Sequence, residues 1–79
     1  MERVQIIEKL TSVFRKVFSD NELVLSDGMT ANDVDQWTSL SHVILITEIE
    51  NNFSITFQLK DLNKLDNVGA MIDIINSKL

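Results

Sequence analysis

The residues of this chain that could most readily do chemistry lie in one short segment, DQWTSLSHVILI, from Asp35 to Ile46. Two hydroxyl residues, Thr38 and Ser39, follow the lone tryptophan, Trp37, and an apolar run begins directly after them. Hydroxyl side chains favour the start of a helix, because they accept hydrogen bonds from its free N–H groups. A hydroxyl can also be the attachment point of a covalently bound group. The hydroxyls of this segment could therefore serve either as a helix cap or as the attachment site of a covalently bound group.

The single histidine, His42, lies in the same segment. A general base needs a nearby reacting group and a partner that orients it, and the sequence supplies neither. We expect instead a histidine packed at a helix–helix contact, with its ring nitrogens satisfied. The chain has no cysteine and no HxxxH or HExxH spacing, so disulfides and thiolate or paired-histidine metal sites are excluded. The sequence predicts neither an enzyme nor a metal site.

The charge of the chain is distributed unevenly along its 79 residues, with a formal net charge of −5. From Val17 to Leu59 there is no lysine or arginine. The charged residues of this interval are all acids: Asp20, Glu22, Asp27, Asp33, Asp35, Glu48 and Glu50. Such a field should repel nucleic acid and anionic membranes, and it should attract basic protein surfaces. The alternative is a solvated acidic surface that serves solubility.

No apolar run approaches the roughly 20 residues that a membrane-spanning helix needs. Charges interrupt the N-terminal segment MERVQIIEKL, which is unlike a signal peptide. We therefore expect a single domain over residues 1–79, located in the cytoplasm and too small for a conventional enzyme cleft.

Apolar spacing predicts the first two elements that must position the hydroxyl segment. A first helix is expected over about residues 2–18, followed by a long aperiodic loop over residues 19–37. The apolar stripe of this helix comprises Val4, Ile7, Leu10, Val13, Phe14, Val17 and Phe18. We expect apolar side chains to pin this loop to the core, namely Leu23, Val24 and Leu25. A second helix should begin at Thr38 or Ser39 and end at Asn52.

The remaining sequence predicts a short helical turn near Gln58 to Asn63 and a last helix capped by Asp66 or Asn67. The apolar stripe of this last helix comprises Val68, Met71, Ile72, Ile75 and Leu79. The expected fold is all-α: a small four-helix bundle of three main helices and a short third helix, with a long loop between helices one and two.

The second helix carries apolar residues on two faces. The inner stripe consists of Leu45, Ile46, Ile49 and Phe53. Leu40 and Ile44 fall on the far face beside Thr47, with Val43 at the margin. These residues could form a partner-docking patch ringed by acids, namely Asp35, Glu48 and Glu50. Alternatively, the 19–37 loop covers them, or they are ordinary exposed apolar residues. We favour docking, because the patch adjoins the two hydroxyls.

The stretch WTSLSHVILITEIENNFSITF resembles the acyl carrier protein family, whose pattern is Asp-Ser-Leu, often preceded by Trp, followed by a helix of the form xxVxLxxxLExxF. The residues that fall on this pattern are Trp37, Ser39, Leu40, Val43, Leu45, Ile49, Glu50 and Phe53, continued by Ile55, Phe57, Asp61, Leu62, Leu65 and Val68. The resemblance extends over essentially the whole chain. Thr38 stands where the family usually has Asp before the serine.

The resemblance implies a four-helix bundle that performs no reaction itself. It implies that Ser39 carries 4′-phosphopantetheine, installed from coenzyme A by a phosphopantetheinyl transferase with magnesium. The thiol of that group would hold acyl chains as thioesters for enzymes of fatty-acid, polyketide or related biosynthesis, such as an acyl ligase or a ketosynthase with a basic docking surface. The expected docking residues are Asp35, Trp37, Thr38, Leu40, Val43, Ile44, Thr47 and Glu48. We expect a monomer that binds neither nucleic acid nor membrane.

Two other functions stay open at this point. The cargo could be an aminoacyl or peptidyl group, which the sequence separates poorly from an acyl group. The chain could also be an unmodified helical interaction module, which would use Leu40 and Ile44 without using Ser39.

Overall fold

The computed structural model describes residues 1–79, and its regular elements are all helices. In chain order these are α1 (Arg3–Phe18), the 3₁₀ turn η1 (Ala31–Asp33), α2 (Ser39–Phe53), α3 (Leu59–Leu62) and α4 (Val68–Lys78). The predicted all-α bundle, with its short third helix and its long loop between helices one and two, is confirmed. The turn η1 within that loop was not predicted.

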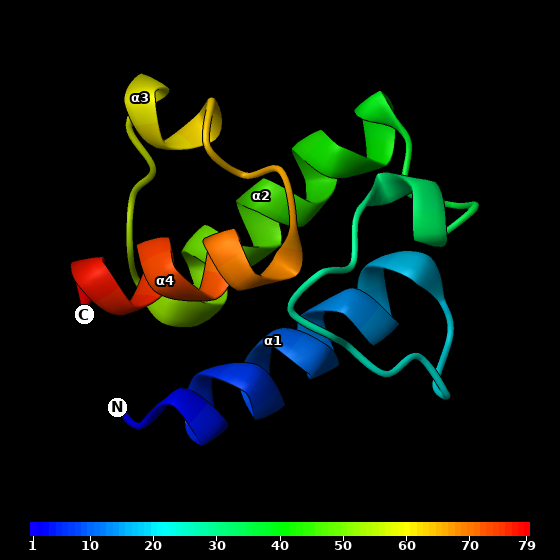
Figure 1. The fold of residues 1–79 in the computed structure, drawn as a ribbon, viewed down its shortest axis with the longest axis horizontal. Coiled ribbons are helices and arrows are strands. Elements are labelled where there is room, and N and C mark those ends of the chain that lie inside the picture. The colour runs from blue at the N-terminus through cyan, green and yellow to red at the C-terminus, as the bar shows by residue number, and fades with distance from the viewer.

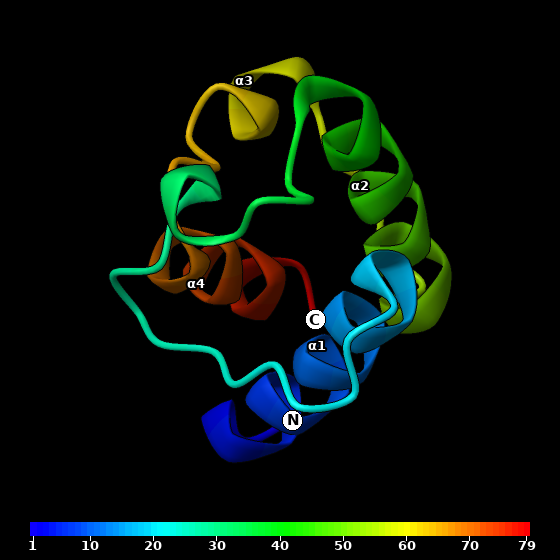
Figure 2. The same ribbon diagram turned by 90° about the vertical axis from the view of Figure 1, so that its right-hand side faces the viewer.

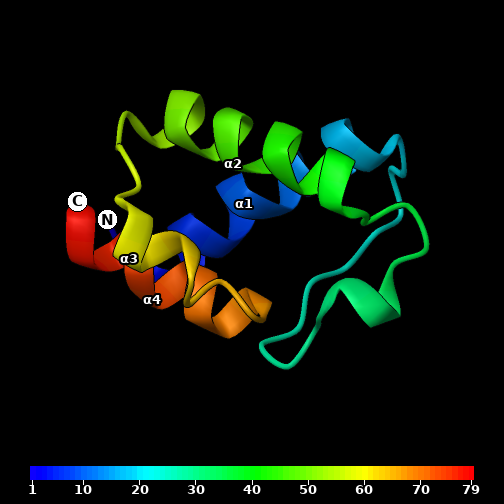
Figure 3. The ribbon, with the colours of Figure 1, turned by 90° about the horizontal axis from the view of Figure 1, so that it is seen from above.

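The helices are arranged so that α1 runs antiparallel to α2 and packs on both α2 and α4 (Figure 1). The two chain termini lie at one end of the bundle, and the long loop lies at the other end (Figures 1 and 3). The start of α2 is therefore at the loop end, away from both termini. No helix is long and apolar enough to cross a bilayer.

The prediction that Val4 belongs to the core stripe of α1 is wrong, because it is 59% exposed, and the buried Ile6 was not predicted. Otherwise the core is one continuous cluster built from the predicted stripes. Its helical members are Ile6, Leu10, Val13, Phe14, Phe18, Leu45, Ile49, Phe53, Val68, Met71, Ile72 and Ile75. Each fully buried large apolar side chain contributes about 1.5–3 kcal/mol relative to an exposed one, so these stripes hold the bundle together. The prediction that Leu79 completes the last stripe is wrong, because Leu79 follows the end of α4 and is exposed.

The long loop is held to the bundle by side chains and by backbone hydrogen bonds. Leu23 and Leu25 pack against the core as predicted, but Val24 is 70% exposed, because it lies between them on the outer side of an extended segment. Farther along, the N–H of Gly69 donates to the Asp27 carbonyl at 2.8 Å, and the loop reaches the start of α4 (Figure 2). The loop therefore links the C-terminal end of α1 with the N-terminal end of α4.

The ends of α2, α3 and α4 are set by local hydrogen bonds. Helix α2 ends at Phe53, one residue beyond the prediction, because Ser54 takes a left-handed conformation with φ 55°. Helix α3 is tied to the last turn of α4 by an ion pair of 2.7 Å between Asp61 and Lys78. Asn67, rather than Asp66, caps α4 by accepting a hydrogen bond from the Ala70 N–H.

Candidate functional site

The hydroxyls at the start of α2 have separate roles. Thr38 is the N-cap: its Oγ1 accepts from the Ser41 N–H at 3.2 Å, and the Thr38 N–H donates to Ser41 Oγ at 2.8 Å. Ser41 Oγ also donates to the Gln36 carbonyl at 2.7 Å. Ser39 lies outside this capping box, at the first position of the helix, and its side chain is exposed. The helix cap and the candidate attachment site are therefore different residues.

Thr38 meets the structural need at this position without a carboxylate. Threonine and aspartate are both strong N-cap residues, because each places an oxygen within reach of the first free N–H groups. The difference is electrostatic, since Thr38 adds no negative charge beside Ser39 and the first turn of α2 contains no acid. The helix start keeps its unpaired N–H groups and partial positive charge, which favour an anion on the adjacent hydroxyl.

Trp37 anchors the end of the long loop directly before the helix start. Its indole is 6% exposed and meets the Phe14 ring edge-on, with centroids 5.3 Å apart and an interplanar angle of 87°. It also lies beside Phe18, at 6.1 Å. The prediction that Trp37 belongs to the docking surface is wrong, because the core covers its side chain. Trp37 instead holds Thr38 and Ser39 at a defined place on the bundle.

His42 shares a hydrogen bond with Trp37 near the start of α2. The indole N–H donates to His42 Nδ1 at 2.9 Å, and the two rings are nearly parallel, at 17°. Nδ1 is the only ring atom of His42 with a hydrogen-bond partner in the chain. Burial lowers the pKa of His42 below its ordinary value of 6.5, so the imidazole is neutral at pH 7.

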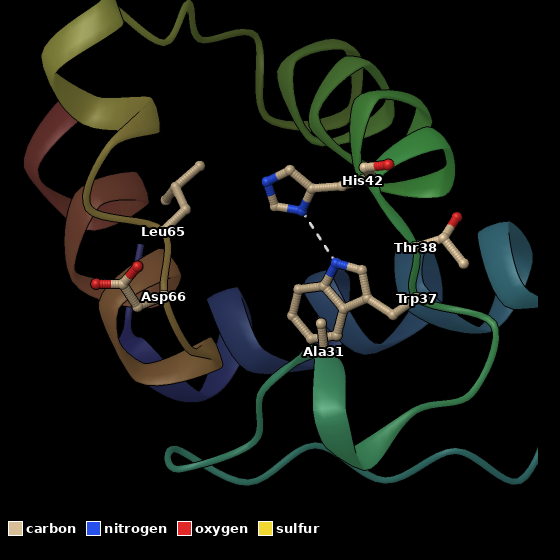
Figure 4. Close-up of a pocket in the computed structure, with 7 residues that line it drawn as sticks. Ala31, Trp37, Thr38, His42, Leu65 and Asp66 are labelled. Carbon is tan, nitrogen blue, oxygen red and sulfur yellow. Dashed lines mark hydrogen bonds between the residues drawn. The ribbon is translucent and has the colours of Figure 1, made fainter.

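A cavity of about 240 Å³ opens beside Ser39 (Figure 4). Its lining comes from η1, the start of α2 and the link between α3 and α4: Ala31, Trp37, Thr38, Ser39, His42, Leu65 and Asp66. A second cavity, of about 230 Å³, lies between α2 and α3 and is lined by His42, Val43, Ile46, Thr47 and Leu62. His42 borders both cavities. Neither cavity was predicted, because each forms only where segments distant in the sequence pack together.

The outer face of α2 carries an apolar surface, as predicted. Leu40 is 76% exposed and Ile44 is 51% exposed, and Val43 is exposed between them. The alternative in which the 19–37 loop covers them is wrong, because that loop packs on the core and on α4 instead. Helix α3 adds Leu59 and Leu62, which are also exposed. We refer to Leu40, Val43 and Ile44 as the α2 patch.

The acids expected around the α2 patch have different positions. Glu48 pairs with Lys16 of α1 at 3.1 Å, and Asp35 is exposed in the loop before the helix. Glu50 does not belong to the ring, because it accepts a hydrogen bond from the Phe57 N–H at 2.8 Å and so supports the link after α2. The exposed Thr47 donates its hydroxyl proton to the Val43 carbonyl at 3.1 Å. No three metal-binding side chains form a group in the structure.

Comparison with solved structures gives a close relative. The chain is similar to a holo acyl carrier protein from Geobacter metallireducens, whose structure was determined by solution NMR, with a TM-score of 0.86 and 44% sequence identity. The match covers 91% of this chain and 83% of that chain. No family model and no curated protein matches the sequence.

Proposed function

The chain belongs to the acyl carrier protein family, and we propose that Ser39 is the residue that carries its 4′-phosphopantetheine group. The observation that carries this proposal is the division of roles in the first turn of α2. Thr38 and Ser41 are engaged in the capping box, whereas Ser39 is exposed and outside it. A transferase can therefore reach the Ser39 oxygen without disrupting the helix start.

The surroundings of Ser39 fit a phosphodiester. The first N–H groups of α2 have no partner within the helix, and the helix dipole places partial positive charge there. The bound group supplies a thiol that holds acyl cargo as a thioester, which explains how a chain without cysteine can serve as a carrier. The protein itself positions the arm and performs no reaction. We propose that residues 1–79 act as one carrier domain, supported by their single continuous core.

Modification in vitro tests the attachment site. The purified protein is incubated with coenzyme A, magnesium and a broad-specificity phosphopantetheinyl transferase, and its intact mass is measured. We expect the wild type to gain one phosphopantetheine mass and Ser39→Ala to gain none. Ser41→Ala is the matched control, because it removes a hydroxyl from the same turn and should still be modified. A modified Ser39→Ala protein, or an unmodified wild type, would refute the proposal.

We also propose that partner enzymes dock on the α2 patch, with Asp35 and Glu48 meeting basic residues on the partner. The partners are the phosphopantetheinyl transferase and acyl-transfer enzymes such as an acyl ligase or a ketosynthase. The patch supports this assignment because it adjoins Ser39 and exposes apolar side chains that the fold does not need to cover. Acidic residues beside it would speed encounter with a basic surface.

Two matched substitutions test the docking surface. Ile44→Ser removes an exposed apolar side chain from the α2 patch, and Val24→Ser removes one from the long loop. Both should change the free energy of unfolding by less than about 0.5 kcal/mol, because both sites are exposed. We expect only Ile44→Ser to lower kcat/KM of the transferase, by about fivefold or more, since truncating an interface anchor costs over about 1 kcal/mol. Equal rates for the two variants would place docking elsewhere.

A further inference from the structure

The hydrogen bond between Trp37 and His42 determines which nitrogen of His42 carries the proton. An indole N–H can only donate, so His42 Nδ1, at 2.9 Å from it, must accept. In the neutral imidazole the proton then lies on Nε2. No other group of the chain accepts a hydrogen bond from this Nε2–H. The structure therefore presents one oriented donor that is free to bind a ligand.

This donor faces the cavity beside Ser39. Figure 4 shows the His42 ring between Trp37 and Leu65, with its second nitrogen directed away from Trp37 and toward the Leu65 side of the cavity. The walls around it include the Ala31 methyl, the Trp37 indole and the Leu65 side chain. Ser39 lines the same cavity. Thr38 and Asp66 complete the lining. A hollow with apolar walls and the His42 donor thus adjoins the proposed attachment site.

We propose that this cavity binds the pantoyl segment of the phosphopantetheine arm, with His42 Nε2–H donating to the pantoyl amide oxygen. The inference rests on the proposed attachment at Ser39. The pantoyl segment directly follows the phosphate, so it is the part of the arm that is nearest to the serine. It combines a geminal dimethyl group with a hydroxyl group and an amide carbonyl, and the hydroxyl-bearing carbon lies between the other two. The methyl groups match the apolar walls, and the amide oxygen matches the His42 donor.

The size and chemistry of the cavity favour this segment over the acyl cargo. Pockets that enclose a drug-sized ligand usually measure about 300–1,000 Å³, and this cavity measures about 240 Å³. It is therefore suited to one segment of the arm rather than to the arm with a long chain. A saturated acyl chain would also leave the Nε2–H without an acceptor, which is unfavourable. The distal part of the arm, which bears the thiol, stays outside and free to reach enzymes.

In this arrangement His42 is a positioning residue. It holds the proximal arm against the bundle, while Trp37 keeps the imidazole in the tautomer that can donate. The side chain that faces it across the cavity, Leu65, is buried and belongs to the core cluster, so that wall is fixed by the fold. The proximal arm should therefore be less mobile than the distal arm.

Solution NMR of the holo protein tests the proposal, after intact mass has shown that the protein carries the group. We expect nuclear Overhauser effects between the geminal methyl protons of the arm and both the Leu65 methyl groups and the Trp37 ring. The His42 Nε2–H should exchange with water more slowly in the holo protein than in the apo protein. In His42→Phe these cross-peaks should be lost. His42→Gln, which keeps an N–H donor, should retain part of them.

The outcomes separate the two proposals. If no mass is added, the attachment at Ser39 is refuted and the cavity proposal with it. If the mass is present but the geminal methyl protons show no contact with Leu65 or Trp37, the attachment stands and the cavity proposal is refuted. Unchanged cross-peaks in a folded His42→Phe protein would show that the cavity holds the arm without the donor, and would overturn the role of His42. Val24→Ser, at an exposed site of the long loop outside the cavity, is the control, and we expect it to preserve the contacts.

Discussion

The hydrogen bond between Trp37 and His42 should contribute measurably to stability, and a double-mutant cycle can isolate that contribution. Trp37→Phe keeps an aromatic ring against Phe14 but removes the N–H donor, and His42→Leu removes the acceptor. A neutral hydrogen bond contributes a net of about 0.5–1.5 kcal/mol. Because the indole is only 6% exposed and the two atoms are 2.9 Å apart, we expect a coupling free energy of about 1 kcal/mol.

Each single variant should lower the free energy of unfolding by more than the coupling free energy alone. Trp37→Phe also loses core packing, since the indole ring contacts both Phe14 and Phe18. We expect its free energy of unfolding to fall by about 2–3 kcal/mol in total. His42→Leu leaves the indole N–H without an acceptor, at a cost of about 1–3 kcal/mol, partly offset by burial of the leucine.

Urea unfolding of the four proteins, followed by far-ultraviolet circular dichroism, measures the cycle. Fluorescence is unsuitable because Trp37 is the only tryptophan. Trp37→Phe combined with Val24→Ala is the control cycle, because the exposed Val24 side chain lies on the outer side of the loop, and the two effects should add within about 0.5 kcal/mol. If the Trp37–His42 coupling is no larger than this control value, the hydrogen bond does not hold the tautomer as described.

Three further predictions concern stability. Gly69→Ala should lower the free energy of unfolding, measured with urea, by about 1 kcal/mol, because overpacking against the Asp27 carbonyl, 3.1 Å from the new Cβ, outweighs the gain in helix propensity. Its control is Gly28→Ala, which should be neutral or slightly stabilising, because no atom lies within 4 Å of the new Cβ. Burial lowers the pKa of His42 in the folded protein, so the contribution of this residue to stability is complete above about pH 6.5 and is lost as the pH falls through the folded pKa. The free energy of unfolding, measured with urea, should therefore differ less between pH 7.5 and pH 5 in His42→Gln than in the wild type. Hydrogen bonds from the Lys78 side chain and the Gln58 N–H lower the pKa of Asp61, so its contribution to stability is present above pH 3.8 and is lost as the pH falls through the folded pKa. In Asp61→Asn the free energy of unfolding should therefore fall less steeply with decreasing pH in the acid range. Unaltered pH profiles in these two variants, or a stabilised Gly69→Ala protein, would contradict the respective predictions.

The helices of this fold could be predicted because their apolar residues repeat at helical spacing. The stripes that contain Phe14, Ile49 and Ile72 are buried as expected. Within the first helix, Val4 is exposed although it was predicted in the stripe, and Ile6 is buried although it was not. Two other errors fall where helical spacing gives no information. Val24 lies in an extended segment, and Leu79 lies beyond the last helical residue, so neither has a helix face that would bury it.

The details of the site were harder to predict than the fold. The sequence placed Thr38 and Ser39 at a helix start, but only the hydrogen bonds show that Thr38 caps it with Ser41. The pairing of Trp37 with His42 joins a loop residue to a helix residue, and no periodic pattern relates them. The cavity beside Ser39 depends on the link that carries Leu65, which only tertiary packing brings there.

The mass of the protein isolated from its own cells tests the central claim most directly, because it reports the modification without an added transferase. Intact-mass measurement followed by fragmentation should show one phosphopantetheine on the peptide that contains Ser39, with a fraction of molecules carrying an additional acyl mass that hydroxylamine removes. Only the unmodified mass, or a phosphopantetheine located on Thr38 or Ser41, would contradict the account.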